Sequence, residues 1–179
     1  MKTMKKIFAM IAVVSASLFL SVPKASAQDQ YFVAGDIKVD AYLGLSVMPW
    51  YHYSPFSFVP IGIGGEYGIV DFGDYAKYGT LSAGAVFEFG LNRYYDAYEE
   101  KSHFKPGFQT AAFGAYHYFV TNELDVHAKS GFAWNSYYRH LGYYGMAGAS
   151  YFLGRPVAVT VEIGYMYGMR AQLGLSLVF

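Results

Sequence analysis

The sequence repeats a two-residue alternation of apolar with polar or small side chains, interrupted by turn-rich breaks. In residues 37–47 the odd positions carry Ile, Val, Ala and Leu, whereas the even positions carry Lys, Asp, Tyr, Gly and Ser. Successive side chains of a strand point to opposite faces, so this period predicts strands with one apolar face. The same alternation recurs in residues 59–69, 81–91, 124–134, 157–165 and 171–179.

Two further segments, residues 108–120 and 143–153, have the length of strands but no clear phase. Ala, Gly and Tyr occupy both of their alternating faces. Counting them, we expect about eight strands, each near the 9–11 residues that a tilted transmembrane strand needs.

The breaks between these segments differ in length. Those at residues 50–57 and 92–107 are long, whereas those at 121–123 and 154–156 are tight turns. Long loops on one rim and short turns on the other are typical of outer-membrane barrels. Residues 71–80 are long for a periplasmic turn, and the break at Gly168-Met169 is short for an external loop.

The composition of the second face decides between a soluble and a membrane barrel. Charged residues make up only 15% of the chain, against about 25% in a typical soluble domain. The polar face is rich in Gly, with about one charge per strand, which suits a narrow interior better than a water-exposed surface. Strands can span lipid only as a closed barrel, because every backbone polar group must be paired. We therefore predict an all-β, closed antiparallel transmembrane barrel of about eight strands, too narrow for an open porin.

The first 27 residues are typical of a cleaved signal peptide. Lys2, Lys5 and Lys6 precede the apolar run 7–22, and Ala25-Ser26-Ala27 is a small-x-small cleavage site. We expect a mature barrel domain over residues 28–179; the alternative is an uncleaved anchor. Without the four lysines of residues 1–27, 9 basic and 13 acidic residues remain, a net charge of −4. This charge and the lack of a basic tract argue against nucleic-acid binding.

The last segment alternates Leu with small or polar residues and ends on Phe. It resembles the final-strand signature of bacterial outer-membrane proteins, which implies recognition by the barrel-assembly machinery. Many members of that class have Tyr third from the end, where this chain has Leu. The mature chain as a whole resembles small barrels of the OmpX and OmpA-barrel type in Gram-negative bacteria. The residues of this candidate assembly signature are Leu173, Leu175, Leu177 and Phe179.

The predicted inward face carries charges of both signs. Because buried charges must be paired, we interpret these residues as a structural network that fills the lumen. We expect Lys129 with Glu162, and Glu88 with Arg170, to lie in one internal polar network, because each pair shares a depth. The other predicted inward ionisable residues are Lys38, Asp40, Glu66, Asp125 and His127.

No catalytic, cofactor or metal site is predicted. The five histidines follow no metal-binding spacing, and the chain has no Cys. His52-Tyr53-Ser54 is superficially similar to the His-x-Ser pair of outer-membrane lipid A deacylases, but no third catalytic residue accompanies it.

These features predict a multi-pass protein of the cell outer membrane with a structural or surface-interaction role, not an enzyme. Its expected partners are outer-membrane lipids and lipopolysaccharide, the assembly machinery, and an extracellular ligand through residues 51–57 and 92–107. The alternatives are a lipid-modifying enzyme on the same barrel and, less favoured, a soluble lipocalin-like carrier.

Overall fold

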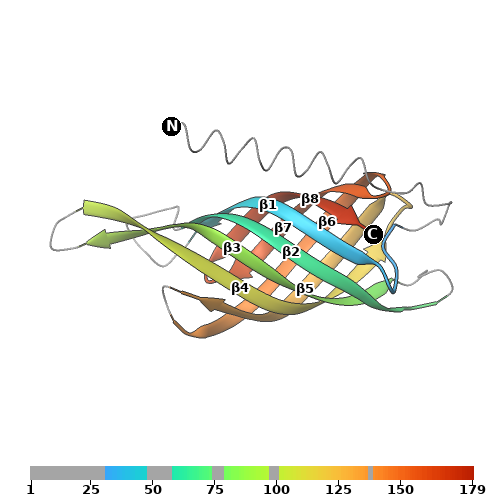
Figure 1. The fold of residues 1–179 in the computed structure, drawn as a ribbon, viewed down its shortest axis with the longest axis horizontal. Helices are drawn as coiled ribbons and strands as arrows, with labels where there is room; N and C mark the ends of the chain where they lie inside the picture. The colour runs from blue at the N-terminus through green and yellow to red at the C-terminus, as the bar shows by residue number, and fades with distance from the viewer. Residues whose placement is uncertain (1–30, 48–57, 74–78, 97–100, 137–138) are drawn as a thin grey trace.

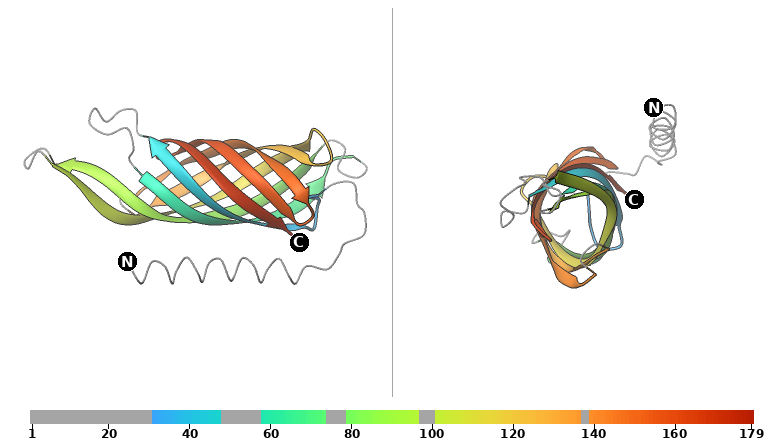
Figure 2. Two further views of the ribbon diagram at one scale, coloured as in Figure 1. Left: turned by 90° about the horizontal axis from the view of Figure 1, so that it is seen from above. Right: turned by 90° about the vertical axis from the view of Figure 1, so that its left-hand side faces the viewer.

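Eight antiparallel strands form a closed barrel, with each strand paired to its neighbours in sequence and β1 paired to β8 (Figures 1 and 2). The computed structural model describes residues 31–47, 58–73, 79–96, 101–136 and 139–179. The strands are β1 (Ile37–Val47), β2 (Phe58–Asp71), β3 (Thr80–Asp96), β4 (Lys101–Phe119), β5 (Leu124–Asn135), β6 (Leu141–Gly154), β7 (Val157–Met166) and β8 (Met169–Val178). In this part of the chain no helix has the length and apolar character of a membrane span.

Closure of the barrel depends on the pairing of the first strand with the last. The register runs from Lys38 opposite Val178 to Val47 opposite Met169. The backbones of Ile37 and Phe179 extend this ladder by exchanging hydrogen bonds of 3.0 and 2.9 Å. No edge strand therefore remains in the wall, as lipid requires.

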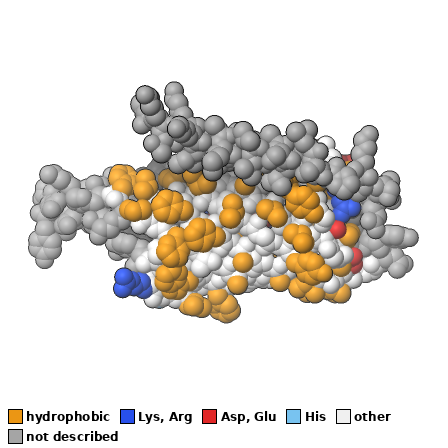
Figure 3. All heavy atoms as spheres, viewed as in Figure 1, with side chains coloured by type: hydrophobic (Ala, Val, Ile, Leu, Met, Phe, Trp, Pro, Cys, Tyr) orange, Lys and Arg blue, Asp and Glu red, His pale blue; other side chains and the backbone are white. Residues whose placement is uncertain are grey.

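The outer wall is apolar, and its phase agrees with the alternation in the sequence. Ile61, Ile63 and Leu173 each expose more than half of their surface. On the face shown in Figure 3, charged side chains gather at the two ends of the barrel, and hydrophobic side chains lie between them. A wall that faced water would leave this belt without cover, so the barrel is a transmembrane barrel rather than a soluble carrier.

The two segments of unclear phase, β4 and β6, point large aromatic residues into the lumen. Phe113 of β4 and Tyr144 of β6 are buried, with ring centroids 5.4 Å apart. Tyr116 and Tyr143 of the same strands are exposed on the outside. Hydrophobicity is therefore similar on both faces of these strands, which explains why alternation could not assign their phase.

The prediction that residues 92–107 form a loop is wrong. β3 and β4 stay paired from Asn92 opposite Lys105 to Asp96 opposite Lys101, and this hairpin projects beyond the other strands (Figure 1). Apolar alternation marks only strand segments that face lipid, so a ladder outside the bilayer does not show it. The predicted turn at Gly168-Met169 is also displaced by one residue, because Met169 belongs to β8 and Tyr167-Gly168 form the connection.

A matched pair of substitutions in β3 tests the assignment of the two faces. Ala85 is exposed on the outer wall, whereas Ser82 is buried and its hydroxyl donates to Glu66 at 2.5 Å. Ala85→Arg should lower the free energy of unfolding in lipid vesicles by roughly 2–4 kcal/mol, since the charge meets hydrocarbon. Ser82→Arg should act by crowding the lumen. Lipid-phase quenching of a label at position 82 but not at 85 would show that the faces are reversed.

Candidate functional site: the lumen and the external hairpin

The lumen contains two buried histidines that face each other across β4 and β5. The tight turn over residues 121–123 sets the register, so that His117 and His127, five residues before and five after Asn122, are direct partners. Both side chains point inward, and their ring centroids lie 5.1 Å apart. Alternation predicted an inward side chain for His127 but not for His117, because residues 108–120 have no clear phase. Counting outward from the turn would have paired the two histidines.

Three carboxylates surround these rings. His117 Nδ1 and His127 Nδ1 lie 2.8 and 3.2 Å from the same oxygen, Asp125 Oδ2. On the far side of each ring, His117 Nε2 contacts Glu66, and His127 Nε2 lies 2.8 Å from Glu162 Oε1. Each imidazole therefore lies between two carboxylates.

Lys129 closes this chain into a ring. Its Nζ atom lies 2.9 Å from Glu162 Oε1 and 3.4 Å from Glu66 Oε2. Asp40 lies further away, with its carboxylate 3.8 Å from Lys129 Nζ and 3.9 Å from Lys38 Nζ. We call this group of eight residues the histidine network: Lys38, Asp40, Glu66, His117, Asp125, His127, Lys129 and Glu162.

The second expected pair lies in a different group of contacts. Arg170 Nη1 donates to Glu88 at 2.5 and 2.6 Å. Tyr42 donates to the same carboxylate at 2.9 Å, and Arg170 Nη2 donates to Gln109 at 3.2 Å. Both predicted pairs, Lys129 with Glu162 and Glu88 with Arg170, are in contact. The prediction that they share one network is wrong, because each pair is held by its own partners on other strands. A cluster of buried apolar side chains, including Phe113 and Tyr144, also fills the lumen.

A segment before β1 closes the mouth of the barrel at which Ile37 and Phe179 lie. Phe32 is fully buried, and its ring packs edge-on against His117 with centroids 4.9 Å apart. Asp71 accepts from the backbone of Ala34 at 2.9 Å, and Arg155 pairs with Asp36 at 2.6 Å. The backbone of this segment passes so close to Gly68 that a Cβ there would collide with Val33. This plug could not be predicted from the alternation, because one aromatic residue before a strand carries no periodic signal.

Tyr167 covers part of the opposite mouth. It has a positive φ of 55°, as expected in a two-residue hairpin connection. Its hydroxyl donates to the carbonyls of Ala133 and His140 at 2.7 and 2.5 Å. With the Phe32 plug at the other end, side chains fill the described part of the lumen, as an eight-stranded barrel of this width allows.

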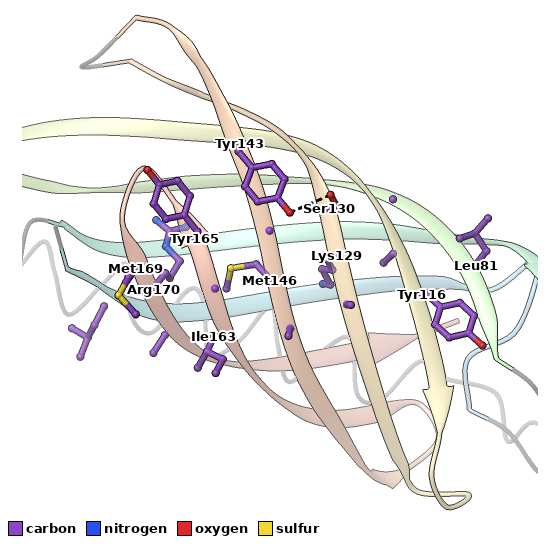
Figure 4. Close-up of a pocket in the computed structure, with 18 residues that line it drawn as sticks. Leu81, Tyr116, Lys129, Ser130, Tyr143, Met146, Ile163, Tyr165, Met169 and Arg170 are labelled. Carbon is purple, nitrogen blue, oxygen red and sulfur yellow. Dashed lines mark hydrogen bonds between the residues drawn. The ribbon is translucent and has the colours of Figure 1, made fainter. Parts of the chain in front are cut away.

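A groove of about 1080 Å³ lies on the outer wall and is lined by residues of β3 to β8 and of β1 (Figure 4). Gly114, Ala128 and Ala147 line it. The hydroxyl groups of Ser130 and Tyr143 lie 3.4 Å apart within it, so each offers the other a polar partner next to hydrocarbon.

The other predicted site residues lie on the described wall or outside the described residues. Leu173, Leu175 and Phe179 are exposed on the outer face of the C-terminal segment, with Leu177 half-buried. Their role in assembly stays a prediction. Residues 51–57, which include His52 and Ser54, lie outside the described residues.

No protein-family profile and no curated protein matches the chain. Among solved structures, a de novo designed transmembrane β-barrel is similar at a TM-score of 0.55 and 16% identity, over 84% of this chain and 100% of that chain. Ail of Yersinia pestis, in complex with the heparin analogue sucrose octasulfate, is similar at a TM-score of 0.51 and 8% identity, over 82% of this chain and 100% of that chain. The N-terminal barrel of Pseudomonas aeruginosa OprF has a TM-score of 0.49 and 16% sequence identity, over 82% of this chain and 98% of that chain.

The closed strand order and the apolar wall define a transmembrane β-barrel. More particularly, it is an eight-stranded antiparallel barrel, a fold that it shares with the designed barrel and with Ail. This confirms the predicted fold class and supports the predicted outer-membrane location.

The contribution of the histidine network to stability can be tested with a double-mutant cycle. Removing one member of a buried ion pair leaves the other charge uncompensated, so Lys129→Met or Glu162→Gln should each cost roughly 3–5 kcal/mol. The double variant should lose less than the sum of the two, because the partners touch at 2.9 Å. Urea unfolding in lipid vesicles gives the free energy of unfolding of the parent, the two single variants and the double variant. Strictly additive losses would contradict direct pairing.

The plug can be tested with substitutions at Phe32. Phe32→Ala should lower the free energy of unfolding by about 3–5 kcal/mol, since a fully buried ring is lost. It should also admit water next to His117. Phe32→Leu, which keeps most of the volume, should cost less. Backbone hydrogen exchange around residues 117 and 125 reports the water, and unchanged exchange in Phe32→Ala would speak against a plug.

Proposed function

We propose that the protein is an outer-membrane barrel that contacts an extracellular ligand or surface through the hairpin of β3 and β4. The observation that carries this proposal is the length of the two strands, which have 17 and 19 residues. A membrane-spanning strand needs about 9–11 residues. The five pairs from Asn92–Lys105 to Asp96–Lys101 therefore extend roughly 17 Å past the wall, at about 3.4 Å per residue.

The projecting ladder has free edges among the described residues. The pairing of β2 with β3 ends at Phe58–Asn92, and that of β4 with β5 begins at Gln109–Asn135. Beyond these points neither strand pairs with a third strand in the part of the chain that the structure describes. Unpaired backbone groups at a strand edge favour contact with another chain.

The sequence of the hairpin indicates what kind of contact this is. Residues 92–105 contain three Tyr, three Lys or Arg and three Asp or Glu. Tyr and Arg are enriched at protein interfaces, whereas a polyanion site needs an excess of positive charge. We therefore favour aromatic and polar contacts with a protein surface over the sulfated type of ligand found in the Ail complex.

Three further parts of the proposal concern export and assembly. Residues 1–27 act as a cleaved signal peptide, and residues 28–179 form the mature barrel domain. The barrel-assembly machinery reads the alternating segment that ends at Phe179. Lipopolysaccharide and other outer-membrane lipids cover the apolar wall. The described residues offer no observation that favours a lipid-modifying enzyme, so we propose no catalytic role.

A shortened hairpin tests the interaction role. Replacing residues 94–103 by Asn-Gly leaves Arg93 opposite Phe104 across a two-residue turn, which is a favoured hairpin geometry. The variant should still fold and show heat-modifiable migration on gels, but cells that display it should lose adhesion to cultured epithelial cells.

The control replaces only residues 97–100 by Gly and Ser, which keeps the ladder. Retained adhesion in this control would assign binding to the ladder rather than to its tip. Equal adhesion by the shortened variant and the parent, or no adhesion by the parent, would rule out the hairpin as the contact surface.

A further inference from the structure

The histidine network has an unbalanced charge. Among the described lumen residues it contains four carboxylates, those of Asp40, Glu66, Asp125 and Glu162, and two ammonium groups, those of Lys38 and Lys129. With both imidazoles neutral, two negative charges have no counterpart. Glu88 and Arg170 balance each other and do not change this sum. Buried charge without a counterion is costly, so the network needs either two more protons or one dication.

The geometry of the two rings fits a dication. His117, His127 and Asp125 each offer one ligand atom, and these three atoms all lie within 4.8 Å of one another. Both Nδ1 atoms also lie close to the same oxygen, Asp125 Oδ2. Zinc bonds of about 2.0–2.1 Å in a tetrahedron place ligand atoms roughly 3.3 Å apart. The observed separations of 2.8 and 3.2 Å from Asp125 Oδ2 need only a small withdrawal of that carboxylate.

The outer partners of the rings also match a metal site. A histidine that binds metal through one nitrogen usually donates its other N–H to a carboxylate, which fixes the tautomer and the ring orientation. Here His117 Nε2 faces Glu66, and His127 Nε2 faces Glu162. With both Nδ1 atoms on a metal, the two Nε2–H groups would donate to these carboxylates, and no lone pair would face a negative oxygen.

One further atom points to a missing partner. Asp125 Oδ1 is buried and has no hydrogen-bond partner among the described residues, although Asp125 is only 1% exposed. A carboxylate that binds a metal through both oxygens would use this atom and supply the fourth ligand.

We propose that His117, Asp125 and His127 bind one divalent transition-metal ion, zinc in the first instance, inside the barrel. Glu66 and Glu162 orient the two imidazoles, and Lys129 holds those two carboxylates in place. Imidazole and carboxylate ligands without thiolate suit zinc, and the set balances the lumen charge. Phe32 covers His117, so the ion enters while the barrel folds. This site is independent of the external hairpin.

The experiment uses the full mature barrel with its three other histidines removed (His52→Asn, His103→Asn, His140→Asn). This parent is refolded into detergent with Zn²⁺, treated with a chelator, and assayed for zinc by atomic emission. We expect one zinc ion per barrel, and much less when Zn²⁺ is added after folding without it. His117→Asn or His127→Asn in this parent should abolish retention. Glu66→Gln should weaken affinity by roughly 10–100-fold while one ion still binds at saturation.

A measurement without lumen substitutions covers the case in which those variants do not fold. In ¹⁵N spectra of the parent, zinc should shift both Nδ1 resonances of His117 and His127 while both Nε2 atoms stay protonated. Two outcomes would overturn the proposal. One is retention of zinc by a folded double variant with His117→Asn and His127→Asn. The other is a parent that retains no zinc after refolding with Zn²⁺ and whose two rings carry protons on both nitrogens, which would mean that protons alone balance the lumen charge.

Discussion

Closure of the wall determines the rest of the molecule. In lipid no backbone N–H or C=O can find water, so β1 must pair with β8 along its length, from Lys38–Val178 to Val47–Met169. Eight strands closed in this way leave an interior just wide enough for side chains. Any polar residue that points inward must then find its partner across the lumen rather than in solvent. The ion pairs of Lys129 and Arg170 with acids on other strands follow directly from this confinement.

The division of the two faces could be predicted, because lipid imposes a strict period of two. Glu162, Lys129 and Glu88 could be assigned to the lumen from alternation alone, and their depth along each strand indicated the partners. The same argument was weak for β4, where Phe113 and Tyr116 are aromatic residues on opposite faces. Where both faces of a strand are apolar, only the register set by the next turn determines which face points into the lumen. Predicting that register requires the exact position of the turn.

Other features carried no signal in the alternation, for physical reasons. The continuation of β3 and β4 past Leu91 lies beyond the lipid, where nothing selects apolar residues, so the ladder resembled a loop. Phe32 acts as a plug only because hydrogen bonds of Asp71 and Asp36 fix the segment around it. Such long-range backbone contacts depend on the finished barrel and leave no local pattern in the sequence.

The two buried ionic groups differ in a way that separates structure from chemistry. Arg170 offers a fork of donors that Glu88 and Gln109 accept, and Tyr42 supplies one further donor to Glu88, so this group is complete within itself. The histidine network has more acceptors than its lysines can balance, and its two imidazoles converge on a single oxygen of Asp125. A lumen selected only for stability could have used a third lysine or an apolar pair at lower cost, since buried ion pairs rarely exceed hydrophobic packing in stability. The presence of two imidazoles between three carboxylates is therefore better explained by a cation bound in the lumen than by packing.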